Sequence, residues 1–461
     1  MRPLIALVLL SSSSLAWAGQ ELARGAVIDN VACQSGQGQG YALYLPSRYS
    51  ADRKWPILYA FDSGARGRLP VERFKNAAER LGVIVAGSNN SRNGPMEISR
   101  AAASAMLQDT QARFAIDPAR VYVTGFSGGA RVATGIALVL KGQVAGVIAF
   151  GAGFPQGLAP SAPLPFAFFG AAGTDDFNYP ELRQLDDTLE RIGARHRLEI
   201  FAGPHDWPPE RVCAHALDWM ELAAARSVAR DGSAAFLDEM FAQAMVEAAG
   251  DESAGRPYEA FQRYAALAKD FAGLRDVSTC EQKARQLDKS REVRQLLADL
   301  KDSVDRQAAL EARFVQVARE SRAGQDGARA TLDLSAAIGS LLKQADAPRQ
   351  SADRMAARRT LVSAWVVLSE AGVGDLARND FAQAAVCFRA MTMIRPENIG
   401  AHYNLACASA RCGNRKEAIE ALRRAVANGF TDVAQLKTDP DLDSLRSEPA
   451  FRLIVEALEK G

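Results

Sequence analysis

The chain has 461 residues, and its 55 lysines and arginines against 54 aspartates and glutamates leave a formal net charge of +1. That balance argues against binding to nucleic acid or to an anionic membrane surface through bulk charge. Hydrophobic residues make up 48% of the chain and charged residues 24%, which is ordinary for a globular protein of more than one domain and argues against disorder.

Glycine and proline divide the chain into two parts. Residues 1–225 hold 23 of the 36 glycines and 14 of the 19 prolines, whereas residues 226–461 hold 13 glycines and 5 prolines. Because these residues mark turns, the distribution predicts a first domain of strands and loops and a second domain that is mostly helical.

The N-terminus has the pattern of a secretory signal peptide. Arg2 supplies a positive charge, Leu4–Leu10 is apolar, and Ala16–Ala18 is a small-x-small site for cleavage after Ala18. The apolar run is too short to span a bilayer, and no later window has about 18 uninterrupted apolar residues. We therefore expect residues 1–18 to be removed and the mature protein to be periplasmic or extracellular, with no integral membrane segment.

Six cysteines in a chain of this length do not form a disulfide framework. Export permits a bridge between Cys33, before the first predicted strand, and Cys213, after the last one, and the sequence leaves that pairing open. Cys387, Cys407 and Cys412 fall in predicted helices, where buried free thiols are expected. No CxxC pair and no cluster of histidines and cysteines indicates a metal site.

In the first half, short apolar runs alternate with amphipathic segments of helical length. The predicted strands are Tyr41–Leu45, Pro56–Asp62, Gly82–Gly87, Val121–Gly125, Ala145–Phe150, Pro165–Gly170 and Arg197–Phe201. The predicted helices are Pro70–Leu81, Ile98–Phe114, Ala130–Leu140 and Tyr179–Ile192. Continuous apolar runs are typical of parallel strands covered on both faces, so the alternation predicts a doubly wound α/β sheet.

Residues 125–129, Gly-Phe-Ser-Gly-Gly, match the pattern G-x-S-x-G. The pattern alone is weak, because a chain of this composition contains roughly 0.2 matches by chance. Its position between a predicted strand and a predicted helix is that of a nucleophile elbow, in which a sharp turn exposes the serine hydroxyl. Ser127 is therefore the candidate nucleophile, and the alternative is an ordinary turn residue.

A serine nucleophile needs a base, and the base needs a carboxylate that orients it. Of the four histidines, His205 follows the last predicted strand, at the edge where doubly wound sheets keep their sites. Asp175 and Asp176 follow the preceding strand. The resulting chain order of serine, aspartate and histidine is that of the α/β-hydrolases. A loop histidine and a turn-forming or helix-capping aspartate are the alternatives.

Residues 30–222 resemble an α/β-hydrolase of the esterase, polyhydroxybutyrate-depolymerase-like and feruloyl-esterase-like group. The segments that carry the resemblance are YALYLP at 41–46, GFSGG at 125–129, GTDDFNY at 173–179 and GPHDWP at 203–208. In similar enzymes the acid is the fourth residue of a G-x-x-D turn, which implies Asp176, with Asp175 as the second choice. The resemblance implies hydrolysis of carboxylic esters through Ser127, His205 and Asp176, with no cofactor.

The oxyanion hole of this fold uses the amide after the nucleophile, here Gly128, and a second amide from the loop after the third strand. That loop is Phe61–Gly67, which departs from the HGGG type, and we favour Ser63 over Gly64 as the second donor. The polar loop Gly87–Gly94 either lines the substrate pocket or is a solvated turn.

Beyond about residue 222, strand signals disappear and apolar residues recur at helical spacing. We expect a hydrolase domain at 19–222, a helical linker region at 223–360, in which a helical hairpin is favoured over a long coiled coil, and a repeat domain at 361–461. Residues 403–425 resemble a tetratricopeptide repeat, with small residues at Ala406 and Ala418 that let two helices approach closely. One or two such units must pack on other helices. They predict either a groove for a protein partner or a structural appendage, and no basic stripe indicates nucleic acid.

The sequence as a whole favours an exported serine hydrolase of carboxylic esters. An interaction scaffold with a catalytically idle hydrolase fold and a serine peptidase of the same fold are the alternatives. The presence of all three residues, Ser127, Asp176 and His205, argues against the idle scaffold. The peptidase is disfavoured because such peptidases often carry a long N-terminal propeller, for which we expect no room at the start of this chain.

Overall fold

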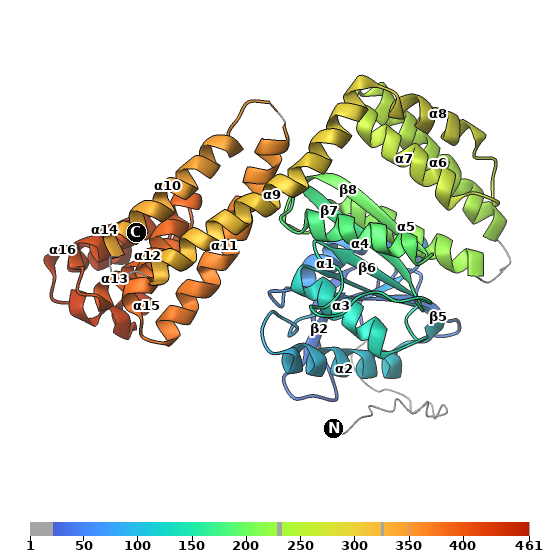
Figure 1. Ribbon diagram of the computed structural model, residues 1–461. Coiled ribbons are helices and arrows are strands. Elements are labelled where there is room, and N and C mark those ends of the chain that lie inside the picture. Colours follow the sequence, from blue (N-terminus) through green and yellow to red (C-terminus); the bar gives the residue numbers. More distant parts are fainter. Residues whose placement is uncertain (1–21, 228–232, 324–326, 350, 461) are drawn as a thin grey trace.

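The computed structural model describes residues 22–227, 233–323, 327–349 and 351–460. The predicted signal peptide therefore lies outside the described residues. A sheet domain (residues 22–227) is followed by a helical region (residues 233–460), and one long helix connects the helices beside the sheet to a second helical lobe (Figure 1).

The sheet has eight strands within the described residues, in the order β1-β2-β4-β3-β5-β6-β7-β8. The strands are β1 (Val27–Ala32), β2 (Gly40–Tyr44), β3 (Trp55–Phe61), β4 (Ile84–Ser88), β5 (Ile116–Phe126), β6 (Gly146–Phe150), β7 (Ala167–Asp175) and β8 (His196–Pro204). β2 pairs antiparallel with its neighbours β1 and β4, and all other neighbours pair parallel. The seven predicted strands each overlap one of these, so the prediction of an alternating α/β sheet is confirmed.

β1 is the strand that the sequence analysis missed. It lies at the edge of the sheet and pairs only with β2 among the described strands. Asp29 and Asn30 in its middle are exposed, so the segment has no continuous apolar run. An edge strand needs only part of its surface buried, and its sequence therefore lacks the signal that identified the central strands.

Helices cover both faces of the sheet. α1 (Arg68–Leu81) and α5 (Glu210–Ser227) pack on one face, and α2 (Met96–Arg113), α3 (Gly128–Val139) and α4 (Tyr179–Arg191) pack on the other. Successive residues of β5 alternate between the two cores, since Tyr122 packs beside α1 and α5 whereas Val123 packs beside α2 and α3. This double coverage explains why the central strands β3 and β6 are apolar at every position.

The remaining elements are helices. They are α6 (Ser233–Ser253), α7 (Pro257–Asp270), α8 (Ser278–Asp288), α9 (Arg291–Ala323), α10 (Gly327–Ala345), α11 (Ala352–Ala377), α12 (Phe381–Ile394), α13 (Ile399–Arg411), α14 (Arg415–Ala427), α15 (Val433–Thr438), the 3₁₀ helix η1 (Pro440–Leu445) and α16 (Pro449–Lys460). α6, α7 and α8 share the core of α1 and α5, while α10 to α16 and the far end of α9 form a second core.

The expected domain boundaries do not fall in loops between helices. The boundary at residue 222 falls inside α5, and the boundary at residue 360 falls inside α11. The favoured hairpin within residues 280–330 is a single long helix over most of its length, α9, which packs against both α10 and α11. Alternating charge and apolar spacing predict helix but give no position for a turn within it.

α13 and α14 form an antiparallel pair in which Ala406 and Ala418 are fully buried, as close helix packing requires. The tetratricopeptide assignment itself stays a prediction.

α11 is long and apolar enough to span a membrane by length and composition alone, within the described residues. It packs against α9, α10 and α12 and contains the fully buried Arg359, as a core helix of a helical domain does.

The cysteines are free thiols in the structure. Cys33 lies beside α2, whereas Cys213 belongs to α5 and is buried in the core on the opposite face of the sheet, so no bridge joins them. Cys387 and Cys407 are buried as expected, but Cys412 is exposed because it caps the end of α13.

Candidate active site

Ser127 lies on a strained turn between β5 and α3. Its φ is 55° and its ψ is −123°, a backbone conformation that residues other than glycine seldom adopt. Two glycines allow the turn to pack closely: a Cβ on Gly125 would lie 2.2 Å from the carbonyl carbon of Gly129, and a Cβ on Gly129 would lie 2.0 Å from the carbonyl oxygen of Phe61. The turn is thus pressed against the end of β3, with Ser127 at its apex.

The structure brings together the three residues singled out as nucleophile, base and acid. His205 Nε2 lies 3.0 Å from Ser127 Oγ, and His205 Nδ1 lies 2.7 Å from Asp176 Oδ1. Asp176 is buried. Because an ionised carboxylate only accepts hydrogen bonds, Nδ1 is the donor toward Asp176 and Nε2 is left to accept the serine proton.

Aromatic rings fix the plane of the His205 imidazole. The ring centroids of Phe126 and Phe177 lie 4.6 and 4.4 Å from that of His205. Gly151 closes the space beside them, because a Cβ there would lie 2.8 Å from the Phe126 ring and 3.0 Å from Asp176 Oδ2. The base is therefore held by packing against two aromatic rings as well as by its two hydrogen-bonding partners.

Asp175 and Asp176 point to different partners. The amide of Asn178 donates to Asp176 Oδ1 at 2.8 Å, which keeps this carboxylate turned toward His205. Asp175 Oδ2 instead accepts from Arg358 of α11 at 3.0 Å. Of the two aspartates, Asp176 is the one that contacts the histidine.

The two candidate oxyanion donors come from neighbouring segments. Gly128 begins α3, where backbone amides lack partners within the helix. Ser63 follows β3, and its carbonyl oxygen accepts from the amide of Asn93 at 2.9 Å. The Asn93 side chain lies over Gly128, since a Cβ on Gly128 would lie 1.9 Å from Asn93 Oδ1. The polar loop 87–94 thus reaches the site, which the sequence analysis left open.

Asp62 is a functional candidate that the sequence analysis missed. Its fully buried carboxylate accepts hydrogen bonds from the Gly64 amide at 2.8 Å, from Arg66 Nε at 2.8 Å and from Trp207 Nε1 at 2.7 Å. Burial by itself would raise the pKa of Asp62, but the hydrogen bonds from Arg66 and Trp207 hold that pKa below its usual value.

The Asp62 carboxylate links two segments that flank Ser127, the Ser63 loop and the segment that carries His205. It holds the loop of Ser63 and Gly64, and through Trp207 it holds the segment that carries His205. Trp207 is itself buried and packs on Phe126, the residue before Ser127. The available signal was an aspartate directly after a buried strand, together with an indole N–H that needs a buried acceptor.

The other three histidines lie in structural networks. His215 of α5 lies 3.0 Å from Glu199 and 3.1 Å from Glu247, in the wall of a cavity of about 720 Å³ that none of Ser127, His205 and Asp176 lines. Burial would lower the pKa of His215, but the two glutamates raise it to about 9. His196 and His402 each bond to a backbone carbonyl oxygen.

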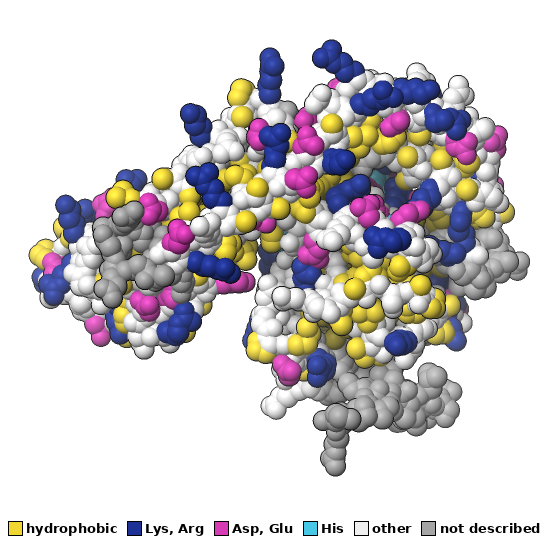
Figure 2. Space-filling model, in the orientation of Figure 1, with side chains coloured by type: hydrophobic (Ala, Val, Ile, Leu, Met, Phe, Trp, Pro, Cys, Tyr) yellow, Lys and Arg dark blue, Asp and Glu magenta, His cyan; other side chains and the backbone are white. Residues whose placement is uncertain are grey.

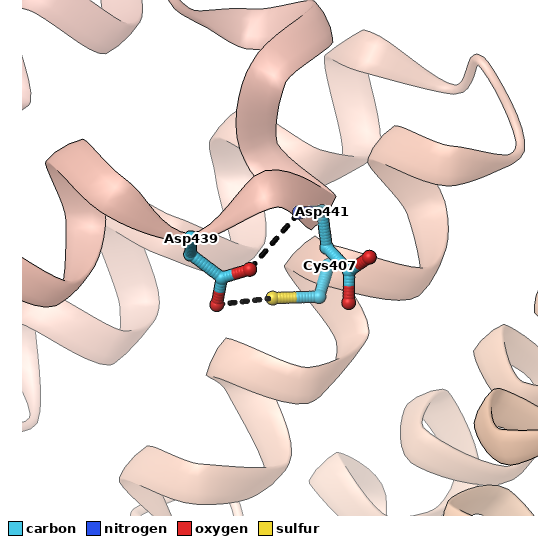
Figure 3. A group of neighbouring side chains, drawn as sticks. All are labelled: Cys407, Asp439 and Asp441. Carbon is cyan, nitrogen blue, oxygen red and sulfur yellow. Dashed lines mark hydrogen bonds between the residues drawn. The ribbon is translucent and has the colours of Figure 1, made fainter.

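Cys407, Asp439 and Asp441 form a group with metal-ligand chemistry in the C-terminal lobe (Figure 3). Its atoms already have protein partners. Asp439 caps η1 by accepting from the Asp441 amide at 3.0 Å and also accepts from Tyr403 at 2.8 Å, while Arg411 pairs with Asp441 at 2.7 Å. The group is thus accounted for as a helix cap and an ion pair. On the face shown in Figure 2, basic and acidic side chains are interspersed over the helical region.

No protein-family model and no curated protein matches the sequence. Similar solved structures include an S-formylglutathione hydrolase from Staphylococcus aureus, at 14% identity over 40% of this chain and 92% of that one, with a TM-score of 0.34. A ferulic acid esterase is 17% identical over 42% of this chain and 94% of that one, with a TM-score of 0.35. A Bacillus cereus carboxylesterase is 16% identical over 41% and 97%, with a TM-score of 0.34.

The fold of the sheet domain follows from its own features. A strained serine between a central parallel strand and a helix, with the aspartate and the histidine later in the chain, defines the α/β-hydrolase fold. The chain thus combines an α/β-hydrolase domain with a large helical region.

Proposed function

We propose that this protein is a serine hydrolase of carboxylic esters that acts through Ser127, His205 and Asp176. The observation that carries the proposal is the strained Ser127, whose hydroxyl lies 3.0 Å from a histidine that itself contacts a buried aspartate. Backbone strain persists at positions where the surrounding structure enforces it, and such positions cluster at catalytic nucleophiles.

The reaction follows from this arrangement. His205 Nε2 takes the proton from Ser127 Oγ while Oγ bonds to the ester carbonyl carbon. The Gly128 amide and an amide from the Ser63 loop stabilise the negative charge on the carbonyl oxygen. When the tetrahedral adduct collapses, the C–O bond breaks and the alcohol leaves with the proton from His205. Water then gives a proton to His205 and attacks the acyl carbonyl carbon; when this second adduct collapses, the bond to Ser127 Oγ breaks, Oγ takes the proton back from His205, and the acid is released.

The decisive experiment is labelling with a fluorophosphonate probe, combined with hydrolysis of p-nitrophenyl acetate. We expect the purified protein to react with the probe and to hydrolyse the ester with a burst of p-nitrophenol, and Ser127→Ala to abolish labelling and the burst. Retained labelling of Ser127→Ala would assign the reaction to another residue. A folded wild-type protein without labelling or hydrolysis would favour the scaffold function.

We propose also that the protein is exported to the periplasm or the extracellular space. The charged start, apolar run and small-x-small site of residues 2–18 support this. Cell fractionation and N-terminal sequencing test the proposal: the expected mature protein lies outside the cytoplasm and begins at Gly19. A cytoplasmic protein that keeps residues 1–18 would contradict it.

A further inference from the structure

The segment Thr174–Asn178, here named the Asp176 loop, is held by residues that lie more than 100 positions later in the chain. Arg359 Nε of α11 donates to the carbonyl oxygen of Thr174 at 2.6 Å, and Gln307 Nε2 of α9 donates to that of Phe177 at 2.8 Å. With the Arg358 contact to Asp175, three side chains of the helical region bond this loop on both sides of Asp176.

Arg359 is the centre of this contact. Its side chain is fully buried, its guanidinium lies 3.9 Å from the Tyr179 ring centroid, and its Nη1 donates to Ser303 Oγ at 2.9 Å. Burial lowers the pKa of Arg359 to about 10, and the charges of Asp175 and Asp176 oppose that shift. Arg359 is thus a buried side chain that the charges of Asp175 and Asp176 help to keep protonated.

Apolar packing also docks the two helices on the sheet domain. Leu300 of α9 and Met355 of α11 are buried against Tyr179, Leu182 and Ile200. Removing these apolar side chains from water stabilises the contact. Docking therefore does not rest on the buried arginine alone.

Polar atoms at this contact carry a cost. Among the described residues, Arg359 Nη2, Asp175 Oδ1 and Gln307 Oε1 are buried without a hydrogen-bond partner. Each such atom destabilises the fold, and an apolar side chain at position 359 would avoid the cost of the one that belongs to Arg359. Burying the Arg359 charge thus has a cost, and its bond to the Asp176 loop is a contact that an apolar side chain could not make.

We propose that Arg359 is a positioning residue for the catalytic acid, and that α9 and α11 complete an active site which the sheet domain does not hold by itself. The proposal rests on the proposed function. Arg359 and Gln307 fix the backbone on either side of Asp176, so the carboxylate stays at hydrogen-bonding distance from His205. The helical region is then a working part of the hydrolase, not only an appendage to it.

Full-length Arg359→Leu and Arg359→Lys variants test the proposal against Arg306→Gln. Arg306 pairs with Asp353 and so joins α9 to α11 without touching the Asp176 loop. We expect Arg359→Leu to lower kcat for p-nitrophenyl acetate about 10- to 100-fold with little change in KM, because small displacements of catalytic groups have effects of this size. Arg359→Lys, which keeps the charge, should recover part of kcat, and Arg306→Gln should keep wild-type kcat.

A second readout does not need activity. The proton between His205 Nδ1 and Asp176 should give a low-field ¹H NMR resonance, assigned by its loss in His205→Gln. We expect it to persist in Arg306→Gln and to weaken or shift in Arg359→Leu or, if that variant does not fold, in Gln307→Leu. An unchanged resonance and kcat in folded Arg359→Leu and Gln307→Leu would overturn the proposal, as would equal losses in Arg306→Gln. An inactive wild type that shows the resonance would overturn the proposed function alone.

Discussion

The serine side and the aspartate side of the site are built in different ways. Ser127 is held by elements of the sheet domain. Gly125 and Gly129 let its turn pack closely against the end of β3, and Asp62 hydrogen-bonds the neighbouring loops. Asp176 lies on a loop that also depends on α9 and α11. A nucleophile can thus be fixed by a strained local turn, whereas the acid on the Asp176 loop needs support from tertiary contacts.

The largest effect is expected on the aspartate side. Asp176→Asn should lower kcat by about 10⁴-fold, because an amide in place of the carboxylate no longer holds His205 in the tautomer that accepts the serine proton. Steady-state hydrolysis of p-nitrophenyl acetate measures this. Asp175→Asn removes only one of three bonds to the helical region and should lower kcat less than about tenfold. A larger loss in Asp175→Asn than in Asp176→Asn would reverse the assignment of the acid.

The second largest effect is expected from Gly129→Ala, which displaces Ser127. The added Cβ would lie 2.0 Å from the backbone oxygen of Phe61, so α3 must shift away from β3 and take Ser127 with it. We expect kcat to fall about 100-fold. Gly135→Ala is the matched control in the same helix, since its Cβ would meet only Pro155 at 3.5 Å. It should keep activity and stabilise the helix by about 0.5–1 kcal/mol. Equal activity of the two variants would show that the elbow does not depend on this close approach.

Asp62→Asn tests whether the Ser63 loop and the segment that carries His205 depend on one shared carboxylate. The amide cannot accept from both Arg66 and Trp207 as the carboxylate does, which loosens the Ser63 loop and the His205 segment together. We expect kcat to fall about 10- to 100-fold and the apparent unfolding temperature to fall by roughly 4 °C. Trp207→Phe, which keeps the ring packing and removes only the indole N–H, should give the same changes at smaller size. Wild-type kcat in both variants would show that Asp62 is only structural.

The smallest effect on activity is expected from His215→Gln, outside the site. Because the pKa of His215 is raised from 6.5 to about 9 in the folded protein, its charge stabilises the fold fully below pH 6.5, and this contribution is lost as the pH rises through about 9. The wild type should therefore lose apparent unfolding temperature between pH 6.5 and 9.5, and His215→Gln should begin lower and show a flatter profile. Thermal unfolding at a series of pH values measures this, and parallel profiles would contradict it.

Local sequence was informative where a single segment contains the whole signal. The strands from Pro56 to Phe201, the elbow around Ser127 and the loops of Asp176 and His205 could all be found from runs of apolar residues, glycines and chain order. The edge strand β1 could not, because its exposed Asp29 and Asn30 interrupt the apolar run. The predicted secretory signal and tetratricopeptide repeat are sequence resemblances that stay predictions.

By itself, the sequence determined the alternation of strands and helices, the place of the serine turn and the candidates for base and acid, because burial pattern and turn chemistry are local properties. Only the tertiary structure decided which aspartate faces His205, that the buried Asp62 bonds Trp207, and that Arg359 reaches Thr174 from a helix 185 residues later. Those contacts join residues far apart in the chain, and no pattern within a single segment specifies them.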